Sequence, residues 1–330
     1  MRAPDFWDKD GSTAKLVRRA LRPLANAYGN SVAHRAAHAS GYRATAKVVC
    51  VGNLMAGGTG KTPIAIAIAR ALLARDKRVC FLTRGYGGHE RGPLKVDPAR
   101  HLATDVGDEA LLLATVAPVI MSRDRGAGGK IADAQGSEVI VMDDGHQNFS
   151  LVKDFSLVVI DSETGFGNGC VLPAGPLREP VRQGLARADA IVIVGHNPID
   201  IPVFGGPILR ARLLPVNDTS LAGDKVIAFA GIGRPEKFFA MLRGLMADLV
   251  GTRAFPDHHL YKQAELNRLR RDARARSATL ITTEKDFVRL PPSEREGIRW
   301  LPVRAEFDDT SALSNLLDRI AARPLAAAPV

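Results

Sequence analysis

The chain of 330 residues is long enough for two domains or one large α/β unit, and its 46% hydrophobic and 24% charged residues exclude a protein that is disordered as a whole. Its formal net charge of +10 favours an anionic partner, either a nucleic acid, an acidic membrane surface or a phosphorylated small molecule. Three cysteines without CxxC spacing, Cys50, Cys80 and Cys170, indicate neither a disulfide framework nor a zinc site.

The N-terminal part of the chain predicts a helix and no signal peptide. The first ten residues lack the apolar core of a signal peptide, and no run of 18 apolar residues occurs anywhere. We therefore expect a cytoplasmic protein without a spanning helix. Over residues 12–39 apolar side chains recur at three- and four-residue steps, which is typical of an amphipathic helix. Pro23 is expected to kink this helix or to split it in two.

Basic side chains occupy much of the remaining surface of this helix, namely Lys15, Arg18, Arg19, Arg22 and Arg35. A basic amphipathic helix can lie in a membrane interface, with its cations near lipid phosphates. It can also pack on its own domain, and the residue pattern taken alone favours that second interpretation.

From residue 46 onward, apolar β-branched runs alternate with helical patterns, as in βαβ units whose parallel sheet is buried on both faces. The runs up to residue 195 are KVVCVG, RVCFLT, APVIM, EVIVMDD, SLVVID and AIVIVG, and helices are expected near 60–75, 107–116 and 123–136. We therefore expect a doubly wound, mostly parallel α/β layer.

The composition changes after Gly195. The stretch HNPIDIPVFGGP is rich in proline and glycine, which is typical of a connection between domains. Beyond it, shorter apolar runs alternate with helices expected near 235–247, 262–276 and 310–322, which predicts a smaller α/β domain. The expected organisation is therefore an N-terminal helical segment (1–45), a core (46–200) and a smaller C-terminal domain (201–330).

The stretch AGGTGKTP, residues 56–63, predicts a phosphate-binding loop. Its end matches the pattern GxxxxGK[ST], although Met55 replaces the first glycine. An apolar run precedes the loop and a helix is expected to follow it, so backbone N–H groups and the helix dipole can hold phosphates. The residues expected to bind a nucleotide are Gly57, Gly58, Thr59, Gly60, Lys61, Thr62 and Pro63.

Two acidic pairs accompany this loop. Asp143 and Asp144 follow four apolar residues, as in the element that organises the metal ion of phosphate-loop proteins. Asp108 and Glu109 lie at a glycine turn that opens a predicted helix, where acids are also expected for capping and for the helix dipole. The pattern leaves both interpretations of the second pair open.

Seven motifs in one order, VGNLMAGGTGKTP, TRGYGG, VGDEA, DDGHQN, LPAGPLREP, DHH and TTEKD, resemble those of the tetraacyldisaccharide 4′-kinases, the lipid A 4′-kinases of Gram-negative bacteria. The resemblance covers about residues 16–290. It implies a P-loop NTPase-like fold and transfer of the γ-phosphoryl group of ATP to the 4′-hydroxyl of tetraacyldisaccharide 1-phosphate. The product would be lipid IVA, a precursor of lipopolysaccharide, made at the cytoplasmic face of the inner membrane.

The resemblance also implies roles for residues. Lys61 and Thr62 would take the phosphate-loop roles, with Lys61 reaching the β- and γ-phosphates. Asp143 or Asp144, together with Glu109 and the Thr62 hydroxyl, would hold or position Mg²⁺.

Asp108 would be the catalytic base in this family. A histidine that follows an aspartate acts beside that base, which corresponds to His258 after Asp257, with His259 as the adjacent alternative. Such a contact would bring the second domain over the first, so domain closure would complete the site.

Three arginines, Arg84, Arg125 and Arg178, are candidates for anion contacts because arginine binds phosphate bidentately. The TTEKD motif could lie near the nucleotide base or close a strand, and the sequence does not decide between these. The resemblance to this family also changes the interpretation of the N-terminal helix, which is now expected to contact the bilayer at an anionic leaflet.

Two other functions fit part of the sequence. The loop resembles that of membrane-associated switch ATPases with a deviant Walker motif, but Ala56 stands where that family has a lysine. The charge alone would suit a nucleic-acid-dependent ATPase, but the basic residues are dispersed and no nucleic-acid module is recognisable. We therefore expect no nucleic acid partner.

Overall fold

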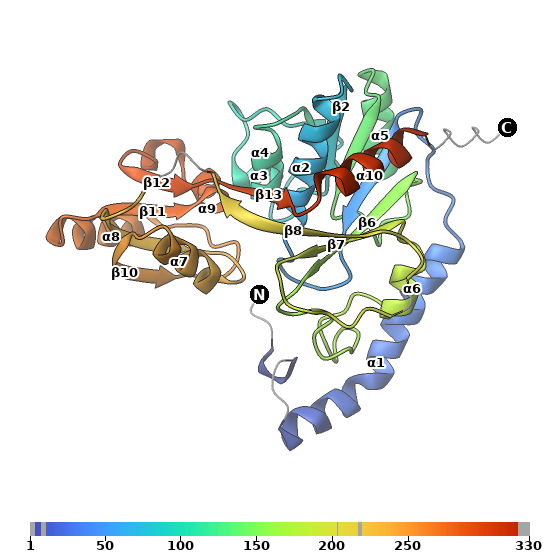
Figure 1. Cartoon of the computed structure of the whole chain (residues 1–330), viewed down its shortest axis with the longest axis horizontal. Helices are drawn as coiled ribbons and strands as arrows, with labels where there is room; N and C mark the ends of the chain where they lie inside the picture. Colours follow the sequence, from blue (N-terminus) through green and yellow to red (C-terminus); the bar gives the residue numbers. More distant parts are fainter. Residues whose placement is uncertain (1–3, 8–10, 203, 217–219, 323–330) are drawn as a thin grey trace.

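The computed structural model describes residues 4–7, 11–202, 204–216 and 220–322. They form a large unit around a nine-stranded sheet and a small unit, residues 220–301, around a four-stranded sheet (Figure 1). Both sheets are α/β layers, so the expected fold class, a P-loop NTPase-like, mostly parallel α/β sheet with a smaller α/β unit, is confirmed.

The large sheet has the strand order β13-β8-β7-β6-β1-β5-β2-β4-β3. Its inner strands are parallel, and only the edge strands β13 and β3 run antiparallel to their neighbours. The strands are β1 (Lys47–Gly52), β2 (Val79–Thr83), β3 (Leu94–Lys95), β4 (Val119–Met121), β5 (Val139–Asp143), β6 (Phe155–Asp161), β7 (Ala190–Val194), β8 (Ile208–Pro215) and β13 (Val303–Phe307).

The helices of the large unit are η1 (Asp5–Trp7), α1 (Ser12–Ala37), α2 (Lys61–Leu73), α3 (Ala103–Val106), α4 (Asp108–Leu113), α5 (Arg125–Ala134), α6 (Val181–Leu185) and α10 (Thr310–Ala322). The helix expected near 107–116 is α4, and a further short helix that was not predicted, α3, precedes it. Gly107 separates them with a φ of 86°, a left-handed conformation that favours glycine.

The buried residues of β1 explain its unbroken apolar run. Val49 and Val51 pack in the core that contains α2, whereas Val48 and Cys50 pack in the core that contains α5. Successive side chains of a strand point to opposite faces, so a sheet covered on both faces needs apolar residues at every position. Burial also raises the pKa of the Cys50 and Cys80 thiols to about 11, which fits their expected role as core residues.

The small unit contains the parallel sheet β10-β9-β11-β12. Its elements are β9 (Lys225–Ala230), α7 (Pro235–Gly244), β10 (Asp248–Ala254), α8 (Gln263–Ala275), β11 (Thr279–Thr283), α9 (Glu284–Arg289), η2 (Pro292–Glu294) and β12 (Ile298–Leu301). Sequence analysis predicted no helix at α9. There the Thr283 hydroxyl accepts from the backbone N–H of Asp286, which is an N-cap that starts a helix within the TTEKD motif.

The division expected at residue 200 does not coincide with the two sheets. β8 belongs to the large sheet, and after the small unit the chain returns to it with β13 and α10. β13 pairs with β8 over Val303–Phe307. The return of the chain to the large sheet therefore depends on a contact between distant segments, which leaves no local sequence signal. We propose residues 220–301 as the smaller domain.

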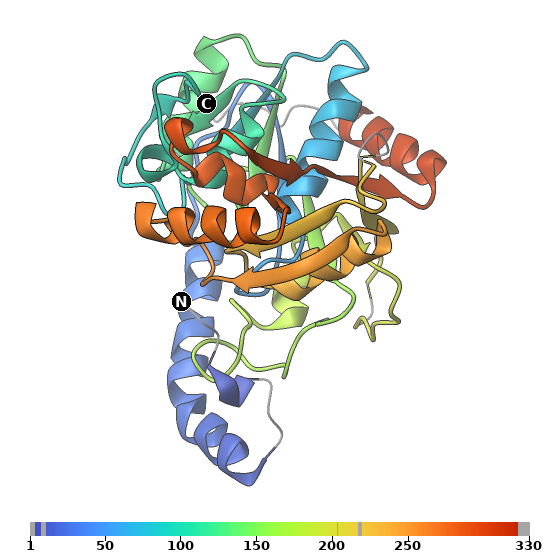
Figure 2. The same ribbon diagram turned by 90° about the vertical axis from the view of Figure 1, so that its left-hand side faces the viewer.

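The N-terminal helix α1 is a single helix that contains Pro23 and bends along its length (Figure 1 and Figure 2). Ala25, Gly29 and Val32 are buried, and Gly29 lies against Pro180. The prediction of two helices is therefore wrong and that of a kinked one fits. Within the described ranges, no helix is both long and apolar enough to cross a bilayer.

Candidate active site

The predicted phosphate-binding loop lies between β1 and α2 at the carboxyl end of the central strand. Gly57 and Gly60 have φ values of 114° and 84°, which only glycine adopts without strain. Lys61 is the first residue of α2 and is 9% exposed. The loop therefore presents the N-terminus of a 13-residue helix and a nearly buried cation to one place, as phosphate binding requires.

A residue before the loop, Asn53, supports it. Asn53 is fully buried, and its Nδ2 donates to the hydroxyl of Thr59 over 3.0 Å. Its backbone carbonyl accepts from Gln147, which in turn donates to the buried carboxylate of Glu179. Sequence analysis missed these three residues, although each belongs to a quoted motif, because their contacts join segments about 30 to 90 positions apart.

Asp143 lies beside the loop because β5 pairs with β1 and places it opposite Val51. The Thr62 hydroxyl donates to Asp143 Oδ2 over 3.0 Å, whereas Asp143 Oδ1 is buried without a hydrogen-bond partner. Burial first and Glu109 second raise the pKa of Asp143 to about 7. A buried, unpartnered carboxylate oxygen beside a hydroxyl and a second acid is a fitting place for a divalent cation.

The described residues contain no group of three or more histidines, cysteines and acids arranged as a metal site. This does not conflict with a magnesium site in a phosphate-loop protein, because Mg²⁺ there uses one or two carboxylates and completes its shell with water and phosphate oxygens. The chemistry of Thr62, Asp143 and Glu109 therefore fits that ion.

Asp144 differs from its neighbour. Arg178 binds it bidentately, with Nη1 2.6 Å from Oδ1 and Nη2 3.1 Å from Oδ2, and Lys61 Nζ lies 3.7 Å from Oδ1. Burial opposes ionisation of Asp144, but Lys61 and Arg178 together hold its pKa well below its usual value. Asp144 is thus paired with two cations. Arg178, a candidate for an anion contact, binds this carboxylate.

The second acidic pair begins α4. Asp108 is 3% exposed, and its Oδ2 lies 3.1 Å from Nδ1 of His258 in the small unit. Asp108 Oδ2 also accepts from Nε of Arg289, and Glu109 lies 3.1 Å from Nζ of Lys285. The predicted contact between Asp108 and a histidine of the second half is therefore present.

Of the two adjacent histidines, only His258 contacts Asp108. His258 has a φ of 57°, in the left-handed region that few residues other than glycine adopt. His259 instead stacks on Phe255 and lies 2.9 Å from Glu265. The geometry assigns the contact to His258.

The charges around Asp108 keep it ionised. Burial alone would raise its pKa, but Lys285, the hydrogen bond to His258 and Arg289 together lower the pKa of Asp108 well below its usual range. Sequence analysis missed Lys285 and Arg289. The signal was the TTEKD motif, because Lys285 belongs to it and Arg289 follows by one helical turn.

The two remaining candidate arginines lie in different environments. Arg84 follows β2 and is exposed. Arg125, the first residue of α5, is 1% exposed; its Nη1 donates to the carbonyl of Ser122 over 2.7 Å, and its Nε has no partner. Burial lowers the pKa of Arg125 to about 10 although Asp144 opposes this. Arg84 thus lies at the surface, whereas Arg125 is buried.

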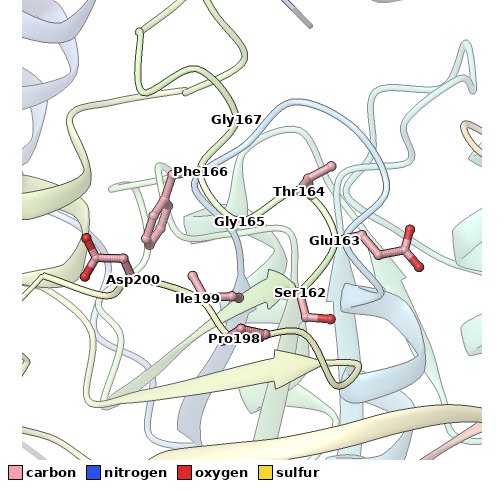
Figure 3. A pocket seen from close by; sticks show the side chains of 9 residues that line it. All are labelled: Ser162, Glu163, Thr164, Gly165, Phe166, Gly167, Pro198, Ile199 and Asp200. Carbon is pink, nitrogen blue, oxygen red and sulfur yellow. The ribbon is translucent and has the colours of Figure 1, made fainter.

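A hollow of about 360 Å³ is lined by residues 162–167, which follow β6, and residues 198–200, which follow β7 (Figure 3). Phe166 and Ile199 supply apolar walls, and the hydroxyl of Thr164 is buried without a hydrogen-bond partner. A Cβ placed on Gly167 would lie 3.4 Å from Met55, so this lining residue lies near the residue that precedes the phosphate-binding loop. Ligands of parallel α/β sheets bind at this carboxyl edge.

Comparisons with known proteins identify the family of this chain. Residues 17–322 match the family model described as tetraacyldisaccharide-1-P 4′-kinase. A tetraacyldisaccharide 4′-kinase of Paramagnetospirillum magneticum is 50% identical over 328 residues, with 98% of this chain and 100% of the relative covered. That of Rhodospirillum rubrum is 48% identical, with 97% and 98% covered.

The fold agrees as well. The crystal structure of LpxK from Aquifex aeolicus in complex with ATP superposes with a TM-score of 0.75 at 28% sequence identity, and covers 92% of this chain and 99% of its own. The family model and the relatives together span nearly every motif described above. The chain therefore belongs to the tetraacyldisaccharide-1-P 4′-kinase family.

Proposed function

We propose that this protein transfers the γ-phosphoryl group of ATP to the 4′-hydroxyl of tetraacyldisaccharide 1-phosphate and so forms lipid IVA in lipid A biosynthesis. The observation that carries the proposal is the contact of Asp108 with His258 of the small unit, beside Glu109, whose charge acts on Asp143. The Asp108–Glu109 pair thus adjoins the phosphate-loop residues on one side and the histidine of the small unit on the other.

ATP would be held by the loop 56–63. The N-terminus of α2 and Lys61 supply positive charge to the phosphates, and the nearby hollow offers room for the part of the nucleotide that extends away from them. The relative from Aquifex aeolicus, described in complex with ATP, supports this assignment.

Thr62, Asp143 and Glu109 would hold Mg²⁺, which when bound neutralises charge on the β- and γ-phosphates. Asp144 would not be a direct ligand, because Arg178 already occupies both of its oxygens. Its role is to fix Lys61, whose Nζ lies 3.7 Å away, in the direction of the phosphates.

Asp108 would orient the acceptor hydroxyl and receive its proton. An alcohol is a weak nucleophile, but in a loose phosphoryl-transfer transition state the proton leaves late, so a low-pKa carboxylate serves mainly by orientation. His258 holds that carboxylate through its Nδ1. Arg84 and Arg125 are proposed to attract the anionic groups of the two substrates.

The lipid acceptor would be reached from the membrane surface. On α1, Leu16, Leu24 and Tyr28 are 68%, 60% and 40% exposed, and Lys15 and Arg19 are exposed beside them. An apolar stripe flanked by cations suits the interface of an anionic bilayer. We therefore propose peripheral binding at the cytoplasmic face of the inner membrane through this surface of α1.

The test is transfer of label from γ-³²P-ATP to tetraacyldisaccharide 1-phosphate in detergent micelles, with and without Mg²⁺ and with and without the acceptor. Labelled lipid that requires both additions is expected. ATP hydrolysis that is independent of the acceptor, without labelled lipid, would contradict the proposal and favour the switch ATPase.

A further inference from the structure

Arg289, the last residue of α9, is a buried cation at the boundary between the two units. Its side chain is 1% exposed, and its Nε donates to Oδ2 of Asp108 in the large unit. Its Nη1 donates within the small unit, to the carbonyl of Gly231 over 2.6 Å and to Asp286 Oδ1 over 2.7 Å. The guanidinium of Arg289 thus connects the proposed catalytic base in the large unit to Gly231 and Asp286 in the small unit.

The anchor of Arg289 is itself rigid. Asp286 is fully buried and accepts from the backbone N–H of Gly231 over 3.0 Å, from the hydroxyl of Tyr261 over 2.8 Å and from that of Thr283 over 2.6 Å. A carboxylate held by three donors besides the guanidinium has little freedom to rotate. The position of the Arg289 side chain is therefore set before any substrate binds.

Gly231, which directly follows β9, connects this anchor to His258. The carbonyl of Gly231 accepts from the backbone N–H of His258 over 3.0 Å as well as from Arg289. Both residues then meet the same oxygen, Asp108 Oδ2. A side chain on Gly231 would lie 3.1 Å from Asp286 Oδ1 and 3.0 Å from His259 Cβ, so the close arrangement leaves little space for any residue larger than glycine.

Lys285 makes the matching contact one helical turn earlier. Residues four apart on a helix share a face, so α9 presents Lys285 and Arg289 together. Lys285 meets Glu109 over 3.1 Å, and Arg289 meets Asp108, the preceding residue of α4. Two consecutive acids are thus fixed by two cations on one short helix.

We propose that Arg289 is a positioning residue for phosphoryl transfer: it fixes the direction of the Asp108 carboxylate toward the acceptor hydroxyl. The inference rests on the proposed role of Asp108 as the base. The geometry explains why an arginine is needed at this position. Its planar guanidinium donates hydrogen bonds to Asp108, Asp286 and Gly231 at once. The single ammonium group of a lysine cannot donate in the same three directions. A misplaced base can cost about a hundredfold in rate.

The test compares Arg289→Lys and Arg289→Gln with wild type in the acceptor-dependent kinase assay, at saturating ATP and with measured ATP KM. For Arg289→Gln we expect kcat to fall about 100-fold and the ATP KM to change less than about twofold. Arg289→Lys should recover only a small part of kcat. The matched control is Arg270→Gln, which removes a partly buried arginine paired with Glu294 in the same unit and should keep wild-type kcat.

A second comparison separates positioning from a general structural role. In the Asp108→Ala background, Arg289→Gln should lower the residual rate less than about twofold, because the group that Arg289 orients is gone. A further loss of about 100-fold in that background would overturn the proposal, as would near wild-type kcat for Arg289→Gln.

Folding and the proposed function are controlled separately. If Arg289→Gln does not fold, as judged by its circular dichroism, Arg289→Lys replaces it in both backgrounds, and wild-type kcat for that variant would overturn the inference. If wild type itself labels no lipid, the proposed function fails. If wild type is active and Asp108→Ala is not, while Arg289 variants are fully active, only the role of Arg289 is wrong.

Discussion

The two sides of the site are built differently. The phosphate side comes from two contiguous motifs, residues 56–63 and 143–144, which lie at the carboxyl ends of the adjacent strands β1 and β5. The acceptor side joins Asp108 to His258 and Arg289, which are 150 and 181 positions away in the chain. Local motifs determine the phosphate side, whereas the acceptor side forms only while the small unit lies against α4.

This difference predicts how each side responds to substitution. On the phosphate side a variant should damage binding and chemistry together, because the loop holds the nucleotide itself. On the acceptor side a variant should lower kcat and leave ATP binding nearly unchanged, because Asp108 and its partners meet the other substrate.

The largest effect is expected for Lys61→Ala. Removal of the nearly buried ammonium should lower kcat/KM for ATP by about 10³-fold or more, since preorganised charge at the transferring phosphoryl group is a major source of catalysis. Steady-state kinetics with labelled ATP measure this. A loss below about tenfold would show that the loop is not the phosphate site.

Asp108→Ala should lower kcat by about 10² to 10³-fold while the affinity for ATP stays within about threefold, as expected for a base that meets the acceptor. Isothermal titration with a non-hydrolysable ATP analogue measures the affinity. If ATP binding collapses instead, Asp108 belongs to the phosphate side and the comparison is wrong.

The adjacent histidines His258 and His259 test the acceptor side with two substitutions in the same loop. His258→Ala should lower kcat about 10 to 100-fold, because it removes the 3.1 Å contact with Asp108. His259→Ala serves as the matched variant, since His259 contacts Glu265 and Phe255, and should retain kcat within about threefold. Equal losses in both variants would contradict the assignment of the contact to His258.

A third histidine provides a test through pH. His146 lies behind the phosphate side, between the Ser156 hydroxyl and the carbonyl of Gly184, and burial lowers its pKa to about 4. The unfolded chain, with a pKa near 6.5, binds this proton more readily than the folded protein, so stability falls as pH drops from about 6.5 to 4.

For His146 this amounts to about 2 kcal/mol of unfolding free energy lost between pH 7 and pH 5. Urea denaturation of wild type and His146→Gln at both values measures it, and the variant should lose that part of the pH dependence. An unchanged pH dependence in the variant would mean that the pKa of His146 is the same in the folded protein as in the unfolded chain.

The smallest effect concerns α1, which lies on neither side of the site. Leu24→Gln should weaken binding to anionic phospholipid vesicles about tenfold, since one exposed leucine contributes about 1.5 kcal/mol or more when it enters lipid. Asn26→Gln, an exposed change on the same helix, is the control and should bind like wild type. Both are measured by vesicle cosedimentation, and equal binding would argue against the proposed membrane surface.

Much of the large sheet could be predicted from the sequence alone. The strands β1, β2, β4, β5 and β7 lie within the predicted runs, and β6 starts one residue before its run, because strands buried on both faces require continuous apolar residues. The phosphate-binding loop was equally predictable. Gly57 and Gly60 are needed for left-handed backbone conformations, and that requirement is local.

The tertiary structure alone decided which side chains meet across the two units. Sequence patterns named Asp108 and left two histidines open, and they did not identify Arg289, because nothing in a local pattern states which residue 181 positions away lies within hydrogen-bond distance. The pairing of β13 with β8 is of the same kind. Local conformation follows from the chemistry of neighbouring residues, but these contacts depend on packing between segments that only the folded chain brings together.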